Sequence, residues 1–248
     1  MKRYNALFFK SKLPEWKKKR DPIPVRYIYR PISFYCAAFC ANHGIKANDV
    51  SNFSTIIGMI ACVLLAIPSY VSGIVGGLFL NAWIILDCTD GNLARNVEKQ
   101  AYGEFLDAMS SYLLIGFLYI SLGYRSYYIN EIIHIQNNIY LLLGALCSIF
   151  GTLMSLLYQK FVLVSKDLGF EEKLSYDGSN SNSLMKLKTT IDMNLSVGGV
   201  LPLLITFSCM FRFTEVLIIL WFVYYLFEFI ATVVYFVIKT QRYNNTEV

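Results

Sequence analysis

Charged residues are scarce in this sequence of 248 residues: 16% are Asp, Glu, Lys or Arg, whereas 56% are hydrophobic. A composition this apolar argues against a water-soluble domain and indicates an integral membrane protein. The chain is long enough for about six transmembrane helices at roughly 20 residues each. We therefore expect an all-α integral membrane protein.

Other signals are missing as well. The N-terminus is charged and amphipathic and has no apolar run before a small-residue cleavage site, so we expect no cleavable signal peptide. The cysteines form no CxxC pair of the kind that binds metal, and we interpret them as small buried hydrophobic residues. The excess positive charge lies beside apolar segments and therefore indicates contact with membrane lipids and no nucleic-acid partner.

Residues 1–44 form a basic interfacial and juxtamembrane segment. Residues 1–29 mix basic and aromatic side chains, including the run Lys17–Arg20, which is typical of a segment on an anionic membrane face. A disordered, solvated tail is the alternative for residues 1–20. The run Pro31–Gly44 is too short to span a bilayer comfortably, so we predict a juxtamembrane amphipathic helix there.

Residues 45–239 are predicted to form a six-helix bundle, so that residues 1–248 make up a single transmembrane domain. A long polar loop, residues 165–194, separates the fourth span from the fifth. The six spans are expected at about Val50–Pro68, from Ser72 through Leu86 into the aspartates that follow, and at Gly103–Leu122, Asn138–Val164, Leu195–Phe211 and Glu215–Ile238.

The distribution of Lys and Arg predicts the orientation. With six spans, both termini and the even-numbered turns lie on one side, and every Lys and Arg except Arg125 and Arg212 lies there. The positive-inside rule then places both termini in the cytoplasm. The aspartate-rich turn shares that side, so we expect a cytoplasmic active site in the inner (plasma) membrane of a bacterium.

The stretch DCTDGNLARNVEKQAYGEFLD, Asp87–Asp107, contains three aspartates within or against apolar segments. Intramembrane carboxylates are costly and usually serve a function. Asp87 and Asp90 stand three residues apart and share a helix face, while Asp107 opens the next apolar segment. Carboxylates from two adjacent helices would form an oxygen-rich site for a hard cation such as Mg²⁺.

Small residues and one arginine accompany these carboxylates. Gly91 and Ala94 lack the bulk that would keep a ligand from the backbone, and the guanidinium of Arg95 suits a phosphate. Gly103 stands four residues before Asp107. Together they fit a complex of metal and pyrophosphate. The structural alternative is a cluster of ion pairs in which Asp90 binds Arg95 or Lys99.

The stretch resembles the signature of the CDP-alcohol phosphotransferase family, DxxDGxxAR, eight residues, then GxxxDxxxD. The upstream run Ile45–Gly58 is similar to the family's first-helix entry, PNxxTxxxxxxG. Seven fixed residues of rare type make the resemblance specific. The matching residues, in order, are Asp87, Asp90, Gly91, Ala94, Arg95, Gly103 and Asp107.

The resemblance implies a transferase that moves a substituted phosphate from a CDP-linked alcohol to a lipid or polar alcohol and releases CMP. It also implies a homodimer and a Mg²⁺ or Mn²⁺ cofactor held by Asp87, Asp90 and Asp107. The nucleotide-binding positions would be Gly91, Ala94, Arg95 and Gly103, and the catalytic positions Asp107 and Ser111.

Two departures from the signature affect this interpretation. Seven residues, not eight, separate Arg95 from Gly103, and Ser111 stands where the family has its fourth aspartate, the proposed general base. A serine is no base near neutral pH without help. Either the acceptor is an already deprotonated phosphate such as polyprenyl phosphate, or Asp107 or Glu104 takes the proton, or the protein binds a nucleotide without turnover.

Rival functions and three further features stay open. A catalytically silent nucleotide- or metal-binding subunit and an ion transporter are the alternatives, although a transporter should carry polar groups across the bilayer. Gly73 and Gly77 favour close helix packing. Asn81 could form an interhelical hydrogen bond or line a polar cavity, and Glu228 could serve either a functional or a structural role.

Overall fold

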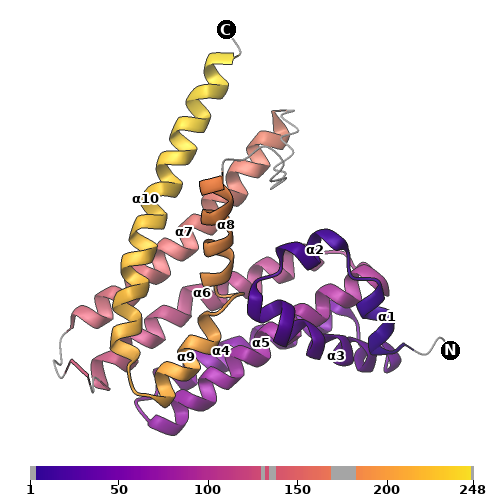
Figure 1. Ribbon diagram of the computed structural model, residues 1–248, viewed down its shortest axis with the longest axis horizontal. Helices are drawn as coiled ribbons and strands as arrows, with labels where there is room; N and C mark the ends of the chain where they lie inside the picture. The colour runs from indigo at the N-terminus through magenta and orange to yellow at the C-terminus, as the bar shows by residue number, and fades with distance from the viewer. Residues whose placement is uncertain (1–3, 130–131, 134–137, 169–182, 247–248) are drawn as a thin grey trace. The chain divides into compact units, whose positions relative to one another are not determined.

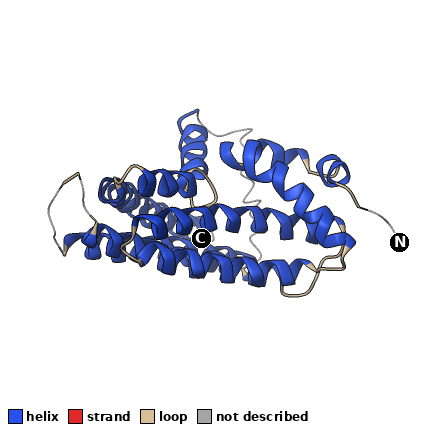
Figure 2. Cartoon of the chain, turned by 90° about the horizontal axis from the view of Figure 1, so that it is seen from below, coloured by secondary structure: helices blue, strands red, loops and turns tan. Residues whose placement is uncertain are grey.

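The computed structural model describes residues 4–129, 132–133, 138–168 and 183–246. All regular secondary structure in these residues is helical, as Figure 2 shows. The all-α prediction is therefore confirmed. Five of the helices in the described part of the chain are long and apolar enough to cross a bilayer, which indicates a membrane protein.

The chain divides into two compact units. The first comprises residues 1–114 and 183–212, and the second comprises residues 115–182 and 213–248. The sequence predicted one domain over residues 1–248, and how the units combine stays a prediction. The aspartate-rich stretch lies entirely in the first unit.

Two long helices, α4 (Ala47–Ala66) and α5 (Tyr70–Asn96), form the main packed pair of the first unit (Figure 1). Glycines on α5 allow its close contacts. A Cβ atom added at Gly76 would lie 2.9 Å from Leu65 Cγ on α4. At Gly77 it would lie 2.6 Å from Thr206 Oγ1 on α9 (Leu201–Met210). The predicted close helix packing is thus confirmed at Gly77.

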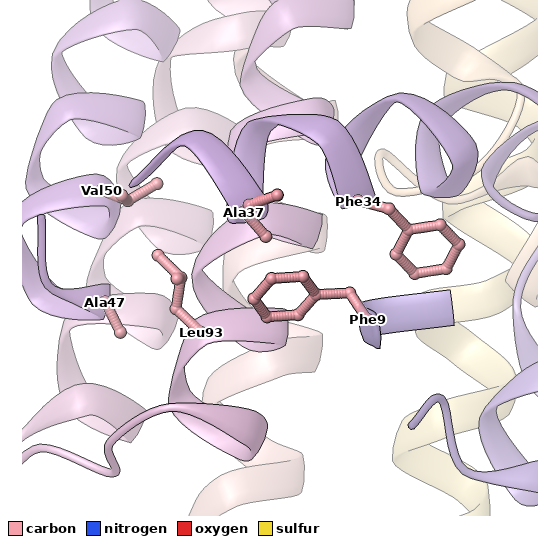
Figure 3. Close-up of a cluster of buried hydrophobic side chains, with 7 residues drawn as sticks. Phe9, Phe34, Ala37, Ala47, Val50 and Leu93 are labelled. Carbon is pink, nitrogen blue, oxygen red and sulfur yellow. The ribbon is translucent and has the colours of Figure 1, made fainter. Parts of the chain in front are cut away.

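The N-terminal residues of the first unit are helical. They form α1 (Ala6–Ser11), α2 (Glu15–Arg20), a short π-helix (η1, Val25–Tyr29) and α3 (Arg30–Asn42). Phe9 of α1 is fully buried in a hydrophobic cluster (Figure 3). This packing favours an ordered segment over a solvated tail for residues 4–20. The cluster brings α1, α3, α4 and α5 together through Phe9, Phe34, Ala37, Ala38, Ala47, Val50 and Leu93.

The second unit contains the end of α6 (Gly103–Tyr128), together with α7 (Ile139–Asp167) and α10 (Thr214–Thr246). Helices α7 and α10 pack against each other. Inside this unit the hydroxyls of Tyr119 and Tyr225 lie 2.7 Å apart, and both residues are buried. Glu228 lies on α10 and thus in a different unit from the three aspartates.

The fifth predicted span is much shorter than expected. Instead of a helix over Leu195–Phe211, the chain ends α8 (Ser183–Leu195), turns, and forms the ten-residue α9. At about 1.5 Å per residue α9 is about 15 Å long, half the thickness of the hydrocarbon core. Helix α8 also occupies part of the predicted polar loop, of which residues 169–182 lie outside the described residues. The described residues therefore contain five long apolar helices and one short one, α9.

Candidate functional site

The three aspartates of the stretch come together from two helices. Asp87 and Asp90 lie on the C-terminal half of α5, and Asp107 lies in the first turns of α6. Asp87 has both other carboxylates as electrostatic neighbours, and Asp107 also acts on Asp90. The three carboxylates, contributed by α5 and α6, are therefore electrostatic neighbours. Asp107 is exposed, whereas Asp90 is buried.

A third helix fixes the orientation of Asp90. The Ser51 hydroxyl of α4 donates a hydrogen bond to Asp90 Oδ2 at 2.6 Å, and both residues are buried. A hydrogen bond to a carboxylate is stronger than one between neutral groups, so it holds the Asp90 side chain in one rotamer. Ser51 was not predicted as a site residue from the sequence. Its contribution to the site depends on packing between α4 and α5.

Ion pairing does not explain the carboxylates. Among the described residues, none of the ion pairs contains Asp87, Asp90 or Asp107. Lys99, one proposed partner of Asp90, instead pairs with Glu104 at 3.2 Å on an exposed surface. These partners do not support the alternative that the stretch is an ion-pair cluster between helices.

Arg95 lies over Gly91, one turn away on α5. A Cβ atom added at Gly91 would lie 3.0 Å from Arg95 Nη1 and 3.2 Å from Nη2. The guanidinium also donates to Asn92 Oδ1 at 3.1 Å, and the Asn92 amide donates to the Ser33 hydroxyl of α3 at 3.0 Å. The absence of a side chain at Gly91 therefore determines where the guanidinium rests. Ala94 lies on the same turn, half-buried beside the hydrophobic cluster.

The turn between α5 and α6 is one residue shorter than in the family signature, and it carries a left-handed residue. Tyr102 has φ +61°, a region that non-glycine residues adopt at a cost of about 1 kcal/mol. Asn48 of α4 secures the turn: its backbone N–H donates to Gln100 Oε1 at 2.8 Å and its amide to the Ala101 carbonyl at 2.9 Å. A Cβ atom at Gly103 would lie 3.4 Å from Asn48 Oδ1. Gly103 is thus set against α4.

Helix α6 is held against α5 close to the position that departs from the signature. The Trp83 indole N–H donates to the Ser110 hydroxyl at 3.0 Å, and both side chains are buried. Ser111 follows, half-buried, and lies one turn from Asp107 on the same face of α6. Glu104, one proposed substitute base, is exposed and paired with Lys99. Of the two proposed substitute bases, Asp107 is therefore the better placed, because it lies beside Ser111 and has no ion-pair partner among the described residues.

The donor chemistry of the site suits a hard divalent cation, since three carboxylates lie in mutual electrostatic range. They do not close into a finished ligand set. Within the part of the chain that the structure describes, no three acidic, histidine or cysteine side chains meet as a metal-binding group. The assignment of Asp87, Asp90 and Asp107 as metal ligands thus stays a prediction.

Positively charged side chains from the N-terminal segment also lie near the aspartates. Lys17 of α2 is within electrostatic range of Arg95, Arg30 and Asp87. Burial and the guanidinium groups of Arg95 and Arg30 lower the pKa of Lys17 below its ordinary value. Arg30 is itself bound by Asp21. From the sequence, the basic run indicated lipid contact only, because nothing local reveals that Lys17 comes within electrostatic range of Arg95.

Asn81 acts as an interhelical hydrogen bonder. Its amide donates to the Gly77 carbonyl at 2.7 Å and to Thr206 Oγ1 of α9 at 2.9 Å. Its oxygen accepts a hydrogen bond from the Tyr29 hydroxyl. These bonds satisfy both the NH₂ group and the oxygen of the amide. They favour the interpretation that Asn81 forms interhelical hydrogen bonds over the one in which it lines a polar cavity.

No protein-family model matches this chain, and no curated protein matches it.

Proposed function

We propose that this chain is a membrane-embedded transferase of the CDP-alcohol phosphotransferase type. It would move a substituted phosphate from a CDP-linked alcohol to a lipid or small-molecule acceptor and release CMP. The observation that carries the proposal is the grouping of Asp87, Asp90 and Asp107 from two neighbouring helices without an ion-pair partner among the described residues. Carboxylates within or against apolar segments are costly and usually serve a function. The motif around them supports the family assignment.

Mg²⁺ or Mn²⁺ fits the chemistry of these three carboxylates. Asp87, Asp90 and Asp107 would hold the ion, and oxygen ligands of this kind are those that both metals prefer. When bound, a divalent cation supplies positive charge that stabilises the negative charge developing on CMP as it leaves the diphosphate.

The remaining residues of the site would position the nucleotide. Arg95 offers a planar, permanently charged fork to a phosphate, and Gly91 leaves room for the ligand to approach the backbone. The hydrogen bond from Ser51 keeps the Asp90 carboxylate in place at 2.6 Å. Fixed polar groups of this kind need no reorganisation when charge moves during the reaction.

The length of α5 supports a site at the edge of the bilayer. Its 27 residues extend about 40 Å, whereas the hydrocarbon core is about 30 Å thick. If Tyr70 lies at one edge of the core, Asp90 lies at the other, where water-soluble nucleotides can reach it. By the positive-inside rule we infer that this edge is cytoplasmic and that both termini are cytoplasmic, so that the segment containing α8 and α9 crosses the bilayer where the fifth span was predicted. A homodimer in a bacterial inner membrane belongs to the same proposal.

The absence of the usual base favours a particular class of acceptor. Ser111 cannot remove a proton from an alcohol at neutral pH unaided. A phosphate acceptor, such as a polyprenyl phosphate, arrives deprotonated and requires no base. For a hydroxyl acceptor, Asp107 would have to act both as ligand and as base.

The test is CMP release by the purified protein with Mn²⁺, a panel of CDP-alcohols and a lipid extract. We expect Asp87→Asn and Asp107→Asn to abolish metal-dependent turnover and Ser111→Ala to cost far less. Asp192→Asn serves as the matched control, because Asp192 pairs with Lys188 at 2.9 Å on α8, a helix that contributes no residue to the motif. Full turnover in Asp87→Asn would refute the proposal.

Further outcomes separate the rival functions. Binding of CDP and metal without release of CMP would identify a catalytically silent binding subunit. Metal flux into vesicles that contain the protein would identify a transporter. Ser111→Asp tests the acceptor: a gain in turnover with hydroxyl acceptors would mean that the chain lacks only a base.

A further inference from the structure

Lys17, Arg30 and Arg95 form a cationic cluster whose members come from three different elements of the first unit. Lys17 lies on α2, Arg30 begins α3, and Arg95 lies in the last turn of α5. Each is within electrostatic range of the other two. Like charges repel, so three cations converge stably only where anions offset them.

Asp21 neutralises one member of the cluster. Arg30 donates from Nε to Asp21 Oδ2 and from Nη2 to Asp21 Oδ1, both at 2.9 Å, and the side chains are only 5% and 8% exposed. In a buried bidentate pair of this kind, the carboxylate neutralises the guanidinium, which is then not available to a ligand. Arg30 therefore has a structural role, and the available charges of the cluster are those of Lys17 and Arg95.

The segment that carries Lys17 is fixed in position. Asp21 closes α2 through its backbone N–H, which donates to the Lys17 carbonyl at 2.8 Å. The N–H of Ile23 donates to Asn194 Oδ1 of α8 at 2.8 Å, and the Arg26 guanidinium donates to the Lys19 carbonyl at 2.9 Å. These contacts hold α2 beside Arg30. Arg30 is linked to Arg95 by hydrogen bonds: its carbonyl accepts from the Ser33 hydroxyl at 2.9 Å, Ser33 accepts from the Asn92 amide, and Asn92 accepts from Arg95. Lys17 therefore lies within electrostatic range of Arg95 in a fixed segment.

The two available cations make weak contacts with protein. Arg95 donates to the neutral amide of Asn92, and Lys17 lies 5.8 Å from the ring of its neighbour Trp16. Neither takes part in an ion pair of the described residues. Asp87 lies within electrostatic range of Lys17 but accepts no hydrogen bond from it in the described structure. Both cations can therefore accept an anionic ligand without breaking a pair.

We propose that Lys17 and Arg95 together bind a phosphate group of the substrate, so that α2 forms part of the binding site beside the aspartates. The inference rests on the proposed function, which supplies a phosphate-bearing substrate. Arg95 would grip two phosphate oxygens with its fork, while the compact ammonium of Lys17 neutralises the charge from the other side. The phosphate belongs either to the diphosphate of the nucleotide donor or to a phosphorylated acceptor.

Lys17→Gln tests the proposal in the full chain, with Lys18→Gln as the matched control. Lys18 is the next residue on α2 and pairs with Glu15 at 2.6 Å on the exposed face. In the first arm, CDP is titrated in the presence of Mg²⁺ by calorimetry. In the second, inorganic phosphate is titrated onto protein already saturated with CDP.

A loss of CDP affinity of about tenfold or more in Lys17→Gln would place the donor diphosphate on Lys17. Unchanged CDP affinity with loss of phosphate binding would place the acceptor phosphate there. Lys17→Arg should restore most of the affinity in either case, and Lys18→Gln should bind like the wild type.

Wild-type affinity of Lys17→Gln in both arms would overturn the inference. If the wild type then still released CMP, the proposed function would stand without it. Conversely, Lys17→Gln could weaken CDP binding although the wild type never releases CMP. That result would support the phosphate-binding site and refute the proposed transferase activity.

Discussion

Replacing Gly91 with alanine should weaken nucleotide binding while leaving the stability of the fold nearly unchanged. The added Cβ would meet Arg95 Nη1 at 3.0 Å and Nη2 at 3.2 Å, so the guanidinium must move by a few tenths of an ångström. These atoms end a flexible side chain, and the movement is cheap. It would weaken the 3.1 Å hydrogen bond to Asn92, while alanine favours the helix by about 0.5–1 kcal/mol. The two effects nearly cancel, so the free energy of unfolding should change by less than about 1 kcal/mol.

Binding of the nucleotide should change much more. A hydrogen bond to a charged group contributes about 1.5–3 kcal/mol, which corresponds to roughly tenfold to hundredfold in affinity. If Arg95 contacts a phosphate, displacing its guanidinium should therefore weaken CDP binding by about tenfold. The measurements are thermal unfolding and calorimetric CDP titration of the same detergent-solubilised sample.

Gly77→Ala on the same helix is the matched control. There the added Cβ would lie 2.6 Å from Thr206 Oγ1 and 2.8 Å from Thr206 Cα, and the backbone of α9 cannot move as a side chain tip can. Overpacking of this kind costs about 1–3 kcal/mol. We expect a lower unfolding temperature with unchanged CDP affinity in the folded protein. Wild-type CDP affinity in Gly91→Ala would refute the assignment of Arg95 to the nucleotide.

Two other predictions concern the N-terminal segment. Asp21→Asn leaves the buried Arg30 guanidinium without its carboxylate, which should lower the free energy of unfolding by about 3–5 kcal/mol in denaturant titrations; wild-type stability would contradict a buried pair. Burial raises the pKa of Tyr29 to about 12, whereas in the unfolded chain it is about 10. The neutral phenol therefore stabilises the fold fully below pH 10, and this stability, on the order of 2 kcal/mol, is lost as the pH rises to 12. Tyr29→Phe should lose less stability over that range, and an identical pH profile would refute the account.

Long apolar segments made most of the fold predictable. The structure places α4, α5, α6, α7 and α10 where the sequence placed five of its spans, because about 20 consecutive apolar residues have few other solutions. The shortened α9 was not predictable in this way. Gly198 and Gly199 lie in a turn before Pro202, and mean hydropathy does not register such a break in the backbone.

The site was predictable only as far as local spacing reaches. The separation of Asp87 and Asp90 placed them on one face of a helix, and their neighbour Asp107 followed from the next span. Ser51 lies 39 positions from Asp90, and Lys17 lies still further from Arg95 in the sequence. Contacts at such separations depend on how helices pack, so no local pattern reveals them.

The lysine near the site and the serine in place of an aspartate favour the same kind of substrate. Asp87, Asp90 and Asp107 bring three negative charges, which Lys17 and Arg95 offset in part because Asp21 has already neutralised Arg30. One divalent cation would leave the group with a positive charge. A fourth aspartate at position 111 would cancel that charge and repel an anionic acceptor, whereas Ser111 leaves it intact. The absence of a carboxylate at position 111 and the presence of Lys17 are therefore consistent with each other if the acceptor of the proposed reaction is itself a phosphate, which needs no base but does need a cation.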